Sequence, residues 1–255
     1  MKSIRTTTVA CAMAVACCAA LVTSGCQRSD PVASPHADGP GLSADQSYLL
    51  GNVAAQRAAV NRRVLARNLA EWLPNQRFVV DGQNVPPETS VVVRGKVESA
   101  QGARGFYVPG GPEEDAPAGT EIPFEDPRAQ WRLIELTISV DAAVGERTEA
   151  REHVGLVVDG PDHERLLRGA ASLGSVVLVL SEAGTFRFDE QLRRVEDVGA
   201  LIGRVDPRGR ISFPALGAES SAVVGDLTTW EAIEKEFATQ KQPIVTDATG
   251  RRVTD

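Results

Sequence analysis

The sequence predicts a mainly β fold with flanking helices. Residues 131–144 alternate between apolar and polar side chains, and residues 90–100 and 175–181 are β-branched apolar runs, which are typical of strands. Before Pro74, apolar residues recur at helical spacing instead, and after residue 227 a capping box indicates a last helix. With 42% hydrophobic residues among 255, the chain can bury the core of one large domain or two small ones.

The expected elements between residues 88 and 213 come in one order. They are strands at 90–100, 131–144 and 154–159, a helix at 161–174, a strand at 175–181 and a hairpin at 200–213. Gly95 lies midway along the first run, where a strongly bent strand favours glycine. The order resembles the OB-fold, a small Greek-key barrel whose helix lies between its third and fourth strands. The resemblance implies an OB-like barrel domain over residues 76–216, with a β-sandwich as the alternative.

Helices are expected on both sides of this domain. Ser43 and Gln46 form a capping box at the start of an amphipathic helix over residues 46–75. Its arginines are either a solvated face or a contact with anionic lipid headgroups: Arg57, Arg62, Arg63 and Arg67. In the segment 217–255, Thr228 and Glu231 form a second capping box, which predicts a C-terminal helix followed by a polar tail. We expect residues 215–226 to be a connecting loop.

The first 26 residues contain all four cysteines of the chain, at positions 11, 17, 18 and 26. Lys2 and Arg5 precede an uncharged run over residues 6–22, which is typical of a secretory signal. The ending Ser24-Gly25-Cys26 resembles a bacterial lipoprotein signal, although Thr23 stands where that family usually has leucine. The alternatives are a site at Cys17, ordinary cleavage without a lipid, and an uncleaved anchor. The resemblance covers residues 1–26 and implies that residues 1–25 are removed and that the Cys26 sulfur receives diacylglycerol.

The segment that follows, residues 26–45, predicts a lipidated N-terminus and a flexible tether, because it contains three prolines, two glycines and no apolar periodicity. The expected location is therefore the extracytoplasmic face of the cell membrane, with membrane lipid as a partner through Cys26. Without Lys2 and Arg5, 25 basic residues remain against 34 acidic ones. That balance argues against nucleic-acid binding and leaves an envelope protein or glycan as the expected second partner.

The sequence contains no catalytic motif that we can identify, so we predict neither catalytic residues nor a cofactor or metal. His36 falls in the tether, and His153 and His163 are interpreted as surface residues. Six acidic residues lie in the long loop after the first strand: Glu113, Glu114, Asp115, Glu121, Glu125 and Asp126. We interpret them as a solvated acidic loop. The alternative is an envelope glycan hydrolase that uses Glu113 or Glu121 with Asp126.

The aromatic residues around the same loop are the candidate ligand-binding site. Four of the twelve aromatic residues of the chain gather there: Phe106, Tyr107, Phe124 and Trp131. Their rings could stack on a sugar or anchor a protein partner; the alternative is that they close the core. In OB-like barrels the ligand meets strands two and three, which here implicates Glu135, Thr137 and Ser139. The sequence thus predicts a lipid-anchored binding or interaction module of the envelope, with a hydrolase or a structural assembly protein as alternatives.

Overall fold

The computed structural model describes residues 41–60, 68–85, 87, 89–107, 120–182, 184, 189, 191–195 and 200–246. All of them belong to the unit Ser34–Asp255, and the unit Met1–Ala33 is not described. The predicted leader, Cys26, His36 and the acidic residues 113–115 lie outside the described residues. Side chains of residues 54–60 and 218 are likewise not described.

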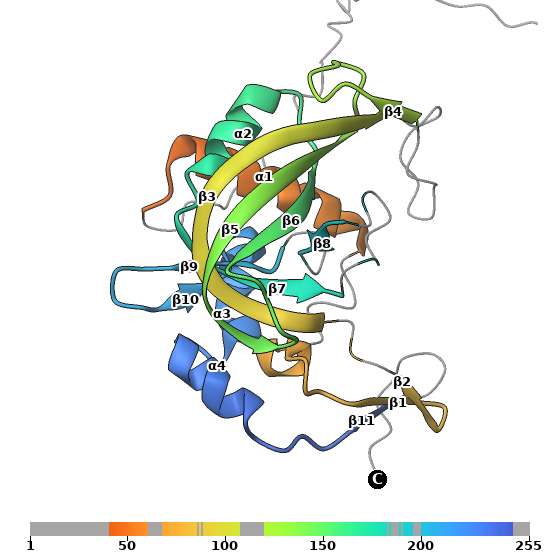
Figure 1. The fold of residues 1–255 in the computed structure, drawn as a ribbon, viewed down its shortest axis with the longest axis vertical. Coiled ribbons are helices and arrows are strands. Elements are labelled where there is room, and N and C mark those ends of the chain that lie inside the picture. The colour runs from red at the N-terminus through yellow and green to blue at the C-terminus, as the bar shows by residue number, and fades with distance from the viewer. Residues whose placement is uncertain are drawn as a thin grey trace, which may run out of the picture. The chain divides into compact units, whose positions relative to one another are not determined.

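The fold is mainly β with flanking helices, which confirms the predicted class (Figure 1). The helices are α1 Ala44–Val60, η1 Leu69–Trp72, α2 His163–Ala171, η3 Pro214–Glu219, α3 Ser220–Val224 and α4 Trp230–Phe237. The strands are β1 Phe78–Val80, β2 Gln83–Val85, β3 Thr89–Tyr107, β4 Thr120–Ile122, β5 Trp131–Gly145, β6 Arg151–Val158, β7 Ser175–Ser181, β8 Arg193–Arg194, β9 Ile202–Val205, β10 Ile211–Ser212 and β11 Ile244–Thr246. None of the described helices is long and apolar enough to cross a membrane.

The larger sheet is built on the long strand β3. Its order is β10-β9-β7-β3-β5-β6-β8, and β4 pairs with the end of β3. β5 pairs antiparallel with β3 along nearly its whole length, interrupted by three register shifts. Such irregularities bend a strand and increase its twist, and Figure 1 shows β3 and β5 curving together. A β-carbon at Gly95 would lie 2.2 Å from the Ser139 carbonyl oxygen, so the bent strand requires glycine there.

The sheet keeps the predicted element order but does not close into a barrel. Along the chain, helix α2 follows β6 and precedes β7, as the OB-like order predicts, and β7 pairs with β3. β8 lies parallel to β6. Among the described residues, the segment after β8 pairs with β7 only through the single bridge between Val195 and Leu180, so no continuous ladder closes the sheet. The predicted closed barrel is therefore corrected to an open, strongly curved sheet.

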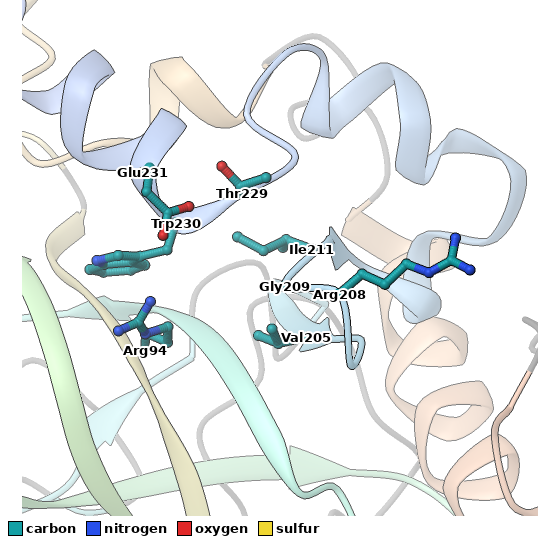
Figure 2. A pocket seen from close by; sticks show the side chains of 8 residues that line it. All are labelled: Arg94, Val205, Arg208, Gly209, Ile211, Thr229, Trp230 and Glu231. Carbon is teal, nitrogen blue, oxygen red and sulfur yellow. The ribbon is translucent and has the colours of Figure 1, made fainter.

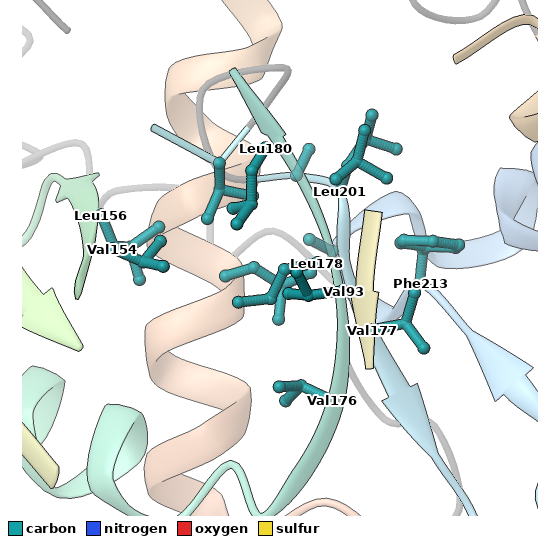
Figure 3. Close-up of a cluster of buried hydrophobic side chains, with 14 of the residues drawn as sticks. Val93, Val154, Leu156, Val176, Val177, Leu178, Leu180, Leu201 and Phe213 are labelled. Carbon is teal, nitrogen blue, oxygen red and sulfur yellow. The ribbon is translucent and has the colours of Figure 1, made fainter. Parts of the chain in front are cut away.

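The main core lies between the sheet and the helices. It gathers side chains from β3, β6 and β7 and from the segment 200–213, with Phe213 and Leu178 fully buried (Figure 3). α1 contributes Leu49, Leu50 and Val53 to the same core. The predicted capping box is confirmed, because the Ser43 N–H donates to Gln46 Oε1 at 2.9 Å and the Gln46 N–H donates to Ser43 Oγ at 3.1 Å.

The C-terminal segment differs from the prediction in three ways. Residues 214–224 form η3 and α3 rather than a loop, and they bury Leu216, Val223 and Val224. The cap of α4 is Thr229 instead of Thr228, because its side chain accepts from the Ala232 N–H. Part of the predicted polar tail is β11, which lies parallel to β1 in a second sheet of order β11-β1-β2.

Candidate functional site

The outer face of β3, β5 and β6 carries a set of polar side chains, which we call the polar strip: Gln101, Glu135, Thr137 and His153. Register places Gln101 opposite Glu135 and His153 opposite Thr137. Gln101 Nε2 donates to Glu135 Oε2 at 3.0 Å, and His153 Nδ1 lies 2.8 Å from Glu135 Oε1. Because an ionised carboxylate only accepts, the Nδ1 atom carries the hydrogen of this contact. Both oxygens of Glu135 are thus held.

The strip agrees in part with the face that the OB-like resemblance implies. Glu135 and Thr137 belong to it, and Ser139 continues the same face of β5, where its hydroxyl is 3.4 Å from the Lys96 carbonyl oxygen. The sequence did not identify His153 as part of a polar set. The predicted strand at 154–159 begins after His153, so the sequence offered no signal, and only the register of β6 against β5 places this side chain opposite Thr137.

The four aromatic candidates do not form one surface. Phe106 is 3% exposed and packs with Leu133, Val157 and Leu192 in a small second cluster. Trp131, partly buried, packs against that cluster. Phe124, also 3% exposed, belongs to the main core, and its ring is perpendicular to the His163 ring at a centroid distance of 6.1 Å. Tyr107 is 37% exposed. Only Tyr107 and Trp131 are accessible to a ligand.

A buried arginine, which sequence reasoning missed, organises the loop that carries Phe124. Arg132 is 1% exposed, and its guanidinium donates to four carbonyl oxygens between 2.7 and 3.1 Å away: those of Phe124, Asp126, Ala129 and Gly160. Burial lowers the pKa of Arg132 from its ordinary value. No sequence pattern distinguishes Arg132 from an exposed arginine, because its acceptors are backbone atoms.

Two of the three described acidic residues of this loop, Glu121 and Asp126, lie against arginines. Arg104 contacts both Glu121 at 3.2 Å and Asp189 at 2.7 Å, and the Asp189 carbonyl oxygen accepts from the N–H of Leu192, a member of the second cluster. Asp126 pairs with Arg128 at 2.7 Å, and hydrogen bonds from that side chain and its backbone N–H lower the pKa of Asp126 to about 2. Such a carboxyl does not supply a proton near neutral pH, so Asp126 is unsuited to the role of general acid.

A small pocket of about 130 Å³ lies between β3, the β9–β10 hairpin and the start of α4 (Figure 2). The Arg94 guanidinium lies over the Trp230 ring, 5.4 Å from its centroid. The opposite wall is apolar and comprises Val205 and Ile211. Glu231 borders the pocket, and its pKa is lowered by its own backbone N–H, then by the Thr229 hydroxyl, with a smaller effect from Arg94.

Comparison with known proteins assigns no role to the polar strip, the aromatic residues or this pocket. No protein-family model, no curated protein and no solved structure matches the chain.

Proposed function

We propose that this chain is a lipid-anchored binding module on the extracytoplasmic face of a bacterial cell membrane. The leader that ends at Ser24-Gly25-Cys26 supports the location, because a thiol follows small residues and an apolar run. Cys26 is the last cysteine of the sequence, so a chain that begins there has one thiol to acylate. Diacylglycerol supplies two chains, which is what stable anchoring requires.

The proposed contact surface is the polar strip, and the observation that supports it most is the Gln101–Glu135–His153 set. Hydrogen bonds to both oxygens fix the Glu135 side chain before any ligand arrives. Binding to groups that are already fixed loses less conformational entropy. The amide, carboxylate and imidazole also combine donors and acceptors on one exposed face. A ligand that fits this chemistry is rich in hydroxyl groups.

We infer that the ligand is an envelope glycan. Trp131 supports this choice, since it lies on the same face of β5 as Glu135 and is partly exposed. Four residues along a strand correspond to about 13 Å, so a ligand that touches both residues is longer than one sugar ring. Between them, Leu133 is buried and belongs to the same small cluster as Leu192. A glycan strand that contacts both Glu135 and Trp131 would therefore pass over this small cluster.

Co-sedimentation of the purified full-length chain with insoluble envelope glycan tests this proposal. We expect the wild-type chain to sediment, and Glu135→Ala and His153→Ala to weaken the affinity about tenfold each, because each removes a charge-assisted hydrogen bond. Glu164→Gln is the control, since this exposed glutamate lies on α2 away from the polar strip. Failure to sediment, or equal affinity in all the variants, contradicts the proposal.

The two alternative functions give different outcomes in the same assay. A glycan hydrolase releases soluble sugar from the pellet, and Glu121→Gln or Asp126→Asn abolishes that release. A structural assembly protein ignores the glycan and instead elutes with a protein partner of the envelope. Retention by a protein after complete removal of the glycan would replace our proposal with that function.

The anchor is tested separately by mass spectrometry of the N-terminal peptide from the native chain. We expect a mature chain that begins at Cys26 and carries the mass of diacylglycerol. The substitution Cys26→Ser should leave the leader attached, because the sulfur that accepts the lipid is missing. A native chain that begins elsewhere contradicts the anchor, while the polar strip remains testable on its own.

A further inference from the structure

The pocket beside α4 is lined by an arginine, Arg94. Arg94 is half-buried on β3, with its guanidinium over the Trp230 ring. Among the described residues, no oxygen accepts a hydrogen bond from this guanidinium. A guanidinium has five N–H donors in a planar fork that matches a carboxylate. The cation–π contact with the Trp230 ring uses none of these donors.

The charge next to Arg94 has the opposite sign. Glu231 stands at the start of α4 and lines the same pocket as Arg94, whose guanidinium contributes to lowering the pKa of Glu231. The carboxylate of Glu231 has several lone pairs and can accept from a ligand as well as from its own helix. Arg208 also borders the pocket, but its side chain points away from Arg94 and Trp230 (Figure 2). The interior therefore presents one cation and one anion.

The size and walls of the pocket restrict the ligand further. A volume of about 130 Å³ is below the roughly 300–1,000 Å³ of pockets for drug-sized molecules. Val205 and Ile211 form an apolar wall across from Arg94. We propose that the pocket binds a free α-amino acid with a short apolar side chain. Its carboxylate accepts from Arg94, its ammonium donates to Glu231, and its side chain contacts Val205 and Ile211.

The walls of the pocket are already held in place. The Ile211 N–H donates to the Thr228 carbonyl oxygen at 2.7 Å and so joins the hairpin to the start of α4. In the hairpin turn, Asp206 Oδ1 accepts from the N–H groups of Arg208 and Arg210 at 2.8 and 2.9 Å. A site that needs little rearrangement loses less free energy on binding. This site shares no residue with the polar strip and does not depend on the proposed function.

Isothermal titration of the full-length chain tests the proposal with L-alanine and L-valine as probes. N-acetyl-L-alanine lacks the ammonium, and L-alaninamide lacks the carboxylate, so each should bind about tenfold more weakly or not at all. Arg94→Gln and Glu231→Gln should each weaken L-alanine binding by a similar factor. Arg208→Gln is the matched control and should bind like the wild type, because that side chain points out of the pocket.

The two comparisons, among ligands and among variants, keep the result decisive. Thermal melting of each variant shows whether it folds, and the comparison of blocked and free amino acids needs no variant. Binding that requires both charged ends and both pocket residues supports the proposal. Absence of binding by the free amino acids overturns it. So does equal binding of the blocked forms, or an affinity that Arg94→Gln leaves unchanged.

Discussion

The ring of Phe124 lies so close to Gly102 that a β-carbon at residue 102 would be 2.5 Å from Cδ1 of the ring. This contact joins the loop before β5 to the middle of β3, and Phe124 is 3% exposed there. Gly102→Ala would force the ring out of its place in the core. We expect it to lower the free energy of unfolding by about 1–3 kcal/mol, measured by urea denaturation.

Gly51→Ala is the control for that experiment. Gly51 lies within α1, and a β-carbon there would have no heavy atom within 4 Å. Since glycine is unfavourable inside a helix, the substitution should raise the free energy of unfolding by about 0.5–1 kcal/mol. A gain from Gly102→Ala, or a loss from Gly51→Ala, would show that the packing at these positions differs from our description.

Arg132→Met should be the most destabilising of the substitutions considered. Methionine fills much of the space but removes four hydrogen bonds from a charged donor to backbone carbonyls. We expect a loss of about 3 kcal/mol or more in the free energy of unfolding. Arg128→Gln serves as the comparison, because the Arg128 side chain is exposed and its loss should change the stability far less.

The lowered pKa of Asp126 predicts that the stability of the fold depends on pH in the acid range. Hydrogen bonding to Arg128 lowers the pKa of Asp126 from 3.8 to about 2 in the folded chain. A depressed folded-state pKa stabilises the fold above the unfolded value, and this contribution is lost as the pH falls from about 4 to 2. Melting temperatures of Asp126→Asn should therefore fall less steeply over that interval than those of the wild type. Parallel curves would refute the assignment, and added salt should weaken the difference.

Gln46 connects α1 to the end of α2, and we expect the fold to be destabilised both by truncation of this side chain and by its replacement with a charged one. Its side chain is buried, accepts from the Ser43 N–H and donates to the Ser172 carbonyl oxygen. Gln46→Ala should cost about 1–2 kcal/mol in the free energy of unfolding. Gln46→Glu should cost more, because a carboxylate would face that carbonyl without a donor. A glutamate variant as stable as the wild type in denaturant titrations would contradict this contact.

The strands and helices with strong local patterns were predicted well from the sequence. β7 has the predicted limits, and β5 and β6 lie within three residues of theirs. β3 extends to Tyr107, beyond the predicted end at residue 100. The prediction stopped short because the second half of the strand is rich in glycine and polar residues and lacks strand periodicity. Its pairing with β5 maintains the extended conformation instead.

Contacts between distant residues were not predictable. β8 and β11 are two and three residues long and exist through pairing with β6 and β1. For the same reason, the sequence revealed Glu135 as a polar face residue but not its contacts with Gln101 and His153. The pocket was missed because Arg94 and Trp230 are 136 positions apart, and neither residue carries a motif.

The parallel pairing of β1 with β11 has a consequence for the order of folding. Phe78 is the register partner of Ile244, so this pairing closes a loop of more than 160 residues. Closing so long a loop is slow and entropically unfavourable until the intervening sheet is compact. Assembly of the small sheet should therefore be a late kinetic step. A chain cut before residue 244 would leave one side of β1 without a neighbour, although the curved sheet could still form.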